Sequence, residues 1–170
     1  MDTLVFDTAA VLNFGHRGDL AILIEILSKH YNLLTTQGVV AELTDPKRKD
    51  FYRAFLAARF KIQTASAVPF DLATLARLSQ TIDLGEITVM ALAKELNAVA
   101  VLDDRAARRE AVRLRIKMTG TLGLLEQAVK RKWLTEAACL ARIMRLCDAG
   151  FTIPRPATHQ TLADYLHGIR

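Results

Sequence analysis

The stretch AVAVLDDRAARREAVRLR, residues 98–115, combines an apolar run, a pair of acids and a basic segment. Residues 98–102 are continuously apolar, which is typical of a short strand buried on both faces of a parallel sheet. Two adjacent carboxylates, Asp103 and Asp104, end this run, and five arginines follow within residues 105–115. The pattern predicts a buried strand that delivers two acids to its carboxyl end, followed by an arginine-rich helix.

Short β-compatible segments alternate with helical patterns along the rest of the chain. We expect further strands at 4–6, 32–36, 61–66 and 116–119. We expect helices at 19–30, from 37 to a break at Pro46, and at 47–60, 71–80, 84–97, 104–114, 122–132, 135–148 and 158–168. Strands that alternate with helices predict a three-layer α/β/α fold with a parallel sheet.

Length and composition limit the class of protein. A chain of 170 residues with 51% hydrophobic residues is large enough to bury the core of one globular domain. No apolar run reaches the roughly 18–20 residues of a membrane-spanning helix, and the N-terminus lacks the basic start of a signal peptide. We therefore expect a cytoplasmic protein without membrane contact. The two cysteines and four histidines do not have the spacing of a zinc site.

Charge is unevenly distributed over the chain. The net charge is +5, but residues 1–45 contain six acidic and two basic residues, a local net charge of −4. Residues 105–145 contain eleven basic and three acidic residues, a local net charge of +8. An acidic region beside a basic region suits a metal-dependent nuclease. A solvated basic helical surface explains the same charges equally well.

Acids follow the predicted strands at comparable places. Asp7 follows the strand at 4–6, and Asp103 and Asp104 follow the strand at 98–102, so these acids should meet at one edge of the sheet. Glu42 and Glu86 lie on helices that extend the same arrangement. Carboxylates that converge repel one another unless a cation neutralises them, and oxygen ligands favour Mg²⁺ or Mn²⁺.

Each acid also has an ordinary structural explanation. Asp83 and Glu86 form the Asp-x-x-Glu pattern of a capping box, and Asp103 or Asp104 suits the N-cap of the helix that follows. Taken alone, Glu42 fits a solvated surface acid. Asp7 is the hardest to explain in this way, because a buried unpaired carboxylate is costly.

Four short motifs together resemble those of the PIN-domain family: DT (7–8), EL (42–43), GE (85–86) and LDD (102–104). The runs DLGEITVMALAKEL (83–96), VLDDRAARREA (101–111), TGTLGLLEQAVKRKWL (119–134) and CDAGFTI (147–153) resemble one branch, the predicted nucleic-acid-binding PIN-like proteins of bacteria and archaea, related to VapC-type toxins. The resemblance covers about residues 3–153. It implies one PIN-like domain over 1–153, with a roughly five-stranded parallel sheet and a C-terminal helical tail, 154–170, packed on the same domain.

The resemblance also implies a Mg²⁺- or Mn²⁺-dependent ribonuclease. Its four acidic positions correspond to Asp7, Glu42, Glu86 and Asp104, with Asp103 as the close alternative to Asp104. Thr8 and Asp83 are expected to support these acids by hydrogen bonding. Many relatives carry Ser or Asn where this chain has Ala9, and losing such a supporting partner typically costs about 10–100-fold in metal affinity or activity.

The leading hypothesis is an endoribonuclease that acts as the toxin of a toxin–antitoxin pair. Its expected partners are RNA, a small antitoxin protein and a second copy of the chain in a homodimer. Part of the arginine-rich helix would then contact RNA, through Arg105, Arg108, Arg109 and Arg113. The alternative is a PIN-fold module that binds RNA or protein with little or no catalysis.

Overall fold

The structure, a computed structural model, describes residues 1–15, 21–43, 59–66, 69–148 and 150–151. It falls into two compact units, residues 1–121 and 122–170. The predicted helices at 47–60 and 158–168 lie essentially outside the described residues, as does the predicted tail at 154–170. The domain boundary after residue 153 therefore stays a prediction.

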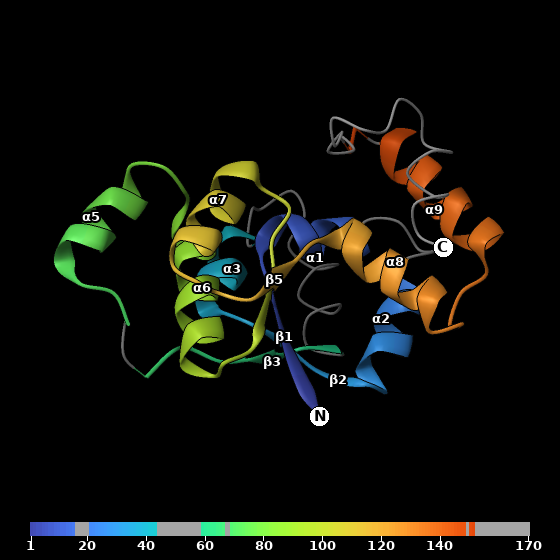
Figure 1. Cartoon of the computed structure of the whole chain (residues 1–170), viewed down its shortest axis with the longest axis horizontal. Coiled ribbons are helices and arrows are strands. Elements are labelled where there is room, and N and C mark those ends of the chain that lie inside the picture. Colours follow the sequence, from blue (N-terminus) through green and yellow to red (C-terminus); the bar gives the residue numbers. More distant parts are fainter. Residues whose placement is uncertain (16–20, 44–58, 67–68, 149, 152–170) are drawn as a thin grey trace. The chain divides into compact units, whose positions relative to one another are not determined.

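The first unit contains a five-stranded sheet in the order β3-β2-β1-β4-β5, and every neighbouring pair is parallel (Figure 1). The strands are β1 (Asp2–Phe6), β2 (Tyr31–Thr35), β3 (Lys61–Ile62), β4 (Val99–Val101) and β5 (Met118–Thr119). The described helices of this unit are α1 (Thr8–Gly15), α2 (Ala21–Ser28), α3 (Gln37–Glu42), α5 (Leu72–Ser79), α6 (Leu84–Glu95) and α7 (Arg105–Arg113). The predicted α/β fold with a parallel sheet is confirmed.

The central strands are apolar because helices cover the sheet. Helices α6 and α2 lie on opposite sides of it in Figure 1, and Val5, Phe6 and Ala100 are completely buried. The ring of Phe6 meets the rings of Phe14 and Phe60 edge-on, with centroids 5.7 and 5.1 Å apart. The continuous apolar pattern at 98–102 thus correctly predicted β4, a strand buried on both faces of the sheet.

Two elements differ from the sequence prediction. Helix α1 was missed, because its eight residues, TAAVLNFG, are too few to show a helical period. The strand predicted at 61–66 is only two residues long, since it lies at the edge of the sheet and pairs only with Leu34 and Thr35 at the end of β2. The remaining described elements begin and end within a few residues of their predicted bounds.

The second unit is described as two helices, α8 (Thr121–Lys130), which begins at the last residue of the first unit, and α9 (Glu136–Asp148). Helix α9 buries Cys139, Ile143 and Leu146, which share one face. Among the described residues, no helix has the length and apolar character needed to cross a membrane.

Candidate metal centre

The strand order places a cleft at the carboxyl edge of the sheet. In the sheet, β1 lies between β2, the next strand along the chain, and β4, which comes much later. Ligands of α/β sheets bind at the point where the strand order reverses in this way. A cleft of about 560 Å³ lies within the first unit. It is lined by Asp7, Thr8, Ala9, Leu12, Glu42, Ser79, Gln80, Thr81, Ile82, Asp83, Glu86, Asp104 and Ala106. The structure thus brings all four predicted acids to one cleft.

Asp7 lies at the bottom of this arrangement, directly after β1. Its backbone N–H donates to the carbonyl of Val101 (3.1 Å), and its Oδ1 accepts from the N–H of Ala10 (2.7 Å) in the first turn of α1. The side chain is only 1% exposed, and Oδ2 has no hydrogen-bond partner among the described residues. Burial raises the pKa of Asp7 well above its ordinary value, and the nearby charges of Asp103 and Glu86 raise it further. A cation bound beside Asp7 would offset both the cost of burying the Asp7 charge and its repulsion by Asp103 and Glu86.

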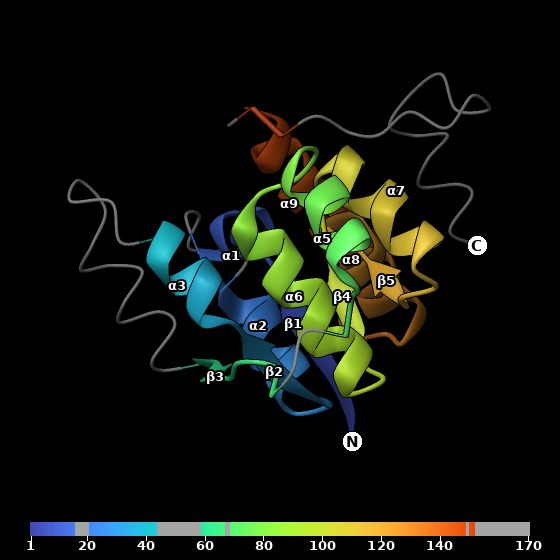
Figure 2. The same cartoon turned by 90° about the vertical axis from the view of Figure 1, so that its left-hand side faces the viewer.

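Glu42 is held at the end of α3 by donors from two other elements. Its Oε2 accepts from the hydroxyl of Thr8, and its Oε1 accepts from the N–H of Gly85 (2.7 Å) at the start of α6. A Cβ atom at Gly85 would overlap the Glu42 carboxylate, and one at Gly38 would overlap the hydroxyl of Thr88. The two glycines let α3 and α6 approach closely (Figure 2). The role of Gly85 was not predicted, although a glycine inside a helical pattern is a sequence signal for close packing.

Glu86 belongs to a capping box, as the Asp-x-x-Glu pattern predicted. Its Oε2 accepts from the backbone N–H of Asp83 (3.0 Å), the N-cap residue of α6. The side chain is half-buried, and burial raises its pKa to about 7, with the charges of Asp104, Asp83 and Glu42 adding to the rise. The cap and the cleft position therefore coexist in one residue.

The two acids after β4 point to different places. Asp104 caps α7, since its Oδ1 accepts from the N–H groups of Ala106 (2.7 Å) and Ala107 (2.9 Å), and it lines the cleft. Asp103 does not line the cleft. Its carboxylate accepts from the side-chain amide of Asn13 (2.9 Å) and the N–H of Thr121 (2.8 Å). Of the pair, Asp104 is therefore the acid that lines the cleft.

The cleft fits a hydrated divalent ion. Among the described residues, no three His, Cys, Asp or Glu side chains converge closely enough to hold a metal ion as they stand. Mg²⁺ usually keeps several of its waters and binds through one or two carboxylates, so such convergence is not required. The donors are carboxylate oxygens, and Asp7 offers a buried oxygen without a partner. Oxygen ligands of this kind select Mg²⁺ or Mn²⁺.

The arginines of α7 do not act as one surface. Arg108 donates to the carbonyl of Leu102 (3.0 Å), and Arg113 pairs with Glu110 (3.1 Å). Arg105 and Arg109 are exposed, and neither makes an ion pair with another residue that the structure describes. None of the four lines the cleft. Of these four arginines, only Arg105 and Arg109 therefore have a guanidinium without a partner among the residues that the structure describes.

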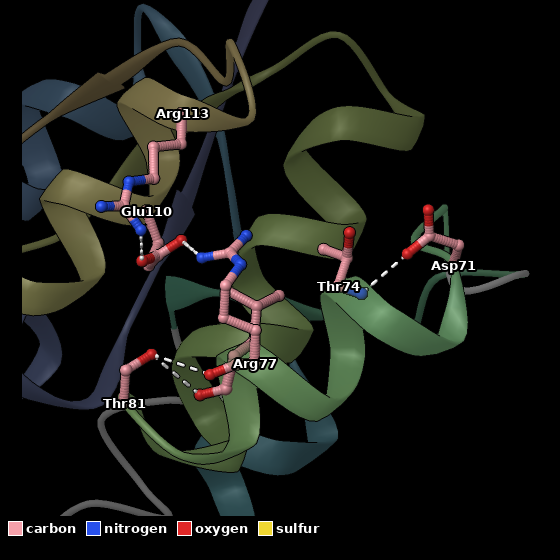
Figure 3. Close-up of polar contacts among 7 residues, drawn as sticks. Asp71, Thr74, Arg77, Thr81, Glu110 and Arg113 are labelled. Atoms are coloured by element: carbon pink, nitrogen blue, oxygen red, sulfur yellow. Dashed lines mark hydrogen bonds and ion pairs between the residues drawn. The ribbon is translucent and has the colours of Figure 1, made fainter.

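One wall of the cleft comes from a segment that sequence analysis gave no function. Ser79, Gln80 and Thr81, at the end of α5, line the cleft with neutral polar groups. An ion cluster around the buried Glu110 joins this helix to α7, as Figure 3 shows: Glu110 lies between Arg77 of α5 and Arg113 of α7. The signal in the sequence is Glu110 itself, the one acid within an arginine-rich helix.

A family model described as a PIN domain matches residues 3–165. Among solved structures, the crystal structure of VapBC2 from Rickettsia felis bound to a DNA fragment from their promoter is similar in fold, with a TM-score of 0.52. The two chains are 18% identical, and the match covers 69% of this chain and 98% of that chain. No curated protein matches the sequence. The family model spans nearly the whole chain, and the structural likeness supports the same fold.

Proposed function

Since the chain belongs to the PIN-domain family, we propose that it is a Mg²⁺- or Mn²⁺-dependent endoribonuclease. The observation that carries the proposal is the cleft: five carboxylates line it, among them the four predicted acids, and Asp7 keeps a buried oxygen without a partner among the described residues. Such a site suits metal-assisted hydrolysis of phosphodiester bonds, and PIN domains are generally nucleases that use a divalent metal.

The residues of the cleft have different roles in this proposal. Asp7, Glu86 and Asp104 would hold the ion, and Glu42 would complete the set from a position fixed by Thr8 and Gly85. A bound Mg²⁺ or Mn²⁺ lowers the pKa of a water and polarises the phosphodiester. Asp83 holds the Glu86 carboxylate through its N–H, so this side chain is oriented before an ion arrives.

We propose that RNA approaches the cleft along the start of α7. Arg105 directly follows the cleft residue Asp104, and Arg109 lies one turn further along the helix. Guanidinium groups at these positions would neutralise phosphates on either side of the scissile bond. Arg108 and Arg113 are already engaged within the protein and would contribute less.

The biological role that we propose is the toxin of a toxin–antitoxin pair, supported by the likeness to VapBC2. An antitoxin protein and a homodimer partner are part of this proposal. We also propose that the protein acts on RNA in the cytoplasm.

The proposal is tested by cleavage of a mixed structured and unstructured RNA pool with Mg²⁺, Mn²⁺ or EDTA. Wild type should cut only with metal, and Asp7→Asn should lower the rate by at least about 100-fold, because it weakens both metal binding and water activation. Asp2→Asn, an exposed acid at the start of the same strand, is the matched control and should cut normally. Full cleavage by Asp7→Asn would refute the assigned site.

A second candidate function is a PIN-fold module that binds RNA or protein with little catalysis. Ala9 favours it, because it lines the cleft with a methyl group where many relatives offer a hydrogen-bonding side chain. RNA retention on a filter without cleavage, together with no Mn²⁺ binding in calorimetry, would favour this function over the nuclease.

A further inference from the structure

Asp103 is one of the most heavily hydrogen-bonded side chains at the carboxyl edge of the sheet, yet it does not line the cleft. Its carboxylate accepts three hydrogen bonds: from Nδ2 of Asn13 (2.9 Å), from the N–H of Thr121 (2.8 Å) and from the hydroxyl of Thr121. Asn13 also donates to that hydroxyl (3.3 Å). The carboxylate therefore joins α1 to the residues that follow β4 and β5.

The surrounding backbone is shaped to admit this carboxylate. A Cβ atom at Gly120 would lie 2.8 Å from Oδ1 of Asp103 and 2.8 Å from Nη1 of Arg108, closer than real Cβ contacts. Arg108 in turn donates to the carbonyl of Leu102 (3.0 Å), which ties α7 to the end of β4. The Gly-Thr pair at 120–121 thus provides the space and the donors that hold Asp103.

The hydrogen bonds around Asp103 fix the position of helix α1. Its first turn is capped by Asp7, whose Oδ1 binds the N–H of Ala10, and its middle is held by the bond from Asn13 to Asp103. The backbone of Asp7 is bonded to Val101, two residues before Asp103. Asp103 thus holds the helix that follows Asp7 against the same strand end that carries Asp104.

We propose that Asp103 is a positioning residue, which fixes α1 against the ends of β4 and β5 and so sets where the Asp7 carboxylate stands relative to Asp104. The inference rests on the proposed function for its consequence in catalysis, but its structural content does not require a metal. It gives the two adjacent acids separate roles: Asp104 faces the cleft, and Asp103 holds α1 in place against the ends of β4 and β5. The alternative, in which Asp103 is itself a metal ligand, makes different predictions.

The first test is amide hydrogen exchange in the metal-free protein. Asp103→Ala, Asn13→Ala and Thr121→Val each remove part of the arrangement, and the last two leave the carboxylate in place. Each should speed exchange at Ala10 and Val11, in the first turn of α1, by about tenfold, the effect of losing one or two net hydrogen bonds. Leu92, buried in α6, serves as the reference amide for global unfolding, and Asp2→Ala is the control variant.

The second test is calorimetric titration of the same variants with Mn²⁺. A positioning role predicts weaker binding by about 10–100-fold in all three. Abolished binding in Asp103→Ala, with unchanged binding and unchanged Ala10 exchange in Asn13→Ala and Thr121→Val, would make Asp103 a ligand and overturn the inference. Unchanged exchange in all three would also overturn it. Faster exchange in a protein that binds no Mn²⁺ would uphold the positioning role and refute the metal-dependent nuclease.

Discussion

Two opposing effects act on the ionisation of the Glu86 carboxyl group. As the third residue of α6's first turn it accepts from the Asp83 N–H, which favours the ionised carboxylate, whereas burial and three neighbouring acids favour the neutral one. The second group of effects is larger, since the pKa rises from 4.5 to about 7. A residue that is strained electrostatically in the absence of metal and relieved in its presence is typical of a functional site.

This conflict predicts how stability depends on pH in metal-free protein. Glu86 has an ordinary pKa in the unfolded chain and a raised one in the folded chain, so its contribution to stability is complete below about pH 4.5 and is lost as the pH rises to about 7. Urea unfolding in EDTA should therefore show the wild type losing more stability than Glu86→Gln between about pH 5 and about pH 8. Asp7, also raised, accounts for a loss that remains in the variant.

Asp2→Asn provides the comparison for this pH series, because Asp2 is exposed and lies outside the cleft. It should follow the wild-type curve. Saturating Mg²⁺ should flatten the wild-type curve, because a bound cation favours the ionised carboxylates. A wild-type curve in EDTA that rises between these pH values would contradict the assignment.

At the scale of elements, the cleft is a product of contacts between helices. Helix α3 brings Glu42 to the start of α6 because Gly38 and Gly85 leave room, and α5 forms a wall because Glu110 holds it to α7. Figure 3 shows how Arg77 and Arg113 reach the same carboxylate from two helices. Asp71 caps the other end of α5 through the N–H of Thr74 (2.7 Å). The ion cluster around Glu110 is thus the main polar link between α5 and α7 among the described residues.

Glu110→Gln should test this link. The glutamine keeps the volume but loses the charge, so two arginines lose a charge-assisted partner and the free energy of unfolding should fall by about 1–3 kcal/mol. Protease susceptibility should rise within residues 71–82. The measurement is urea unfolding followed by limited proteolysis.

Glu126→Gln is the matched control for Glu110→Gln. Glu126 pairs with Lys130 (2.6 Å) on the surface of α8, and such i,i+4 pairs are worth about 0.3–0.5 kcal/mol. If both variants lost the same small amount, the cluster between α5 and α7 would have no special role in holding the wall of the cleft.

At the scale of the whole molecule, the sequence predicted most of the fold because the relevant signals are local. The apolar run before Asp103 marks a buried strand, and acids at strand ends meet in a parallel sheet whatever the details of packing. What the sequence could not provide depends on three-dimensional approach. Which of Asp103 and Asp104 faces the cleft depends on Thr121, and the place of Glu42 depends on the missing side chain of Gly85.

The arginines show the same limit for charge. The sequence predicts a basic helix at 104–114, but it cannot separate side chains that neutralise an acid or a carbonyl within the protein from those that remain available. The structure engages Arg108 and Arg113 internally and leaves Arg105 and Arg109 exposed. A net positive charge favours association with a polyanion, yet only the available groups release counterions when they bind it.

The salt dependence of RNA binding should therefore test whether Arg105 and Arg109 contact phosphates. For single-stranded RNA the slope of log K against log salt changes by about 0.7 for each phosphate contact, so Arg105→Gln and Arg109→Gln should each reduce its magnitude by about that amount. Lys117→Gln removes an equal charge from an exposed residue at the opposite end of β5 from the cleft, and it should leave the slope unchanged. Equal reductions in all three variants would mean that RNA senses only the net charge, and the proposed path along the start of α7 would be wrong. A reduction confined to Arg105→Gln and Arg109→Gln would place the RNA backbone beside Asp104, where a ribonuclease needs it.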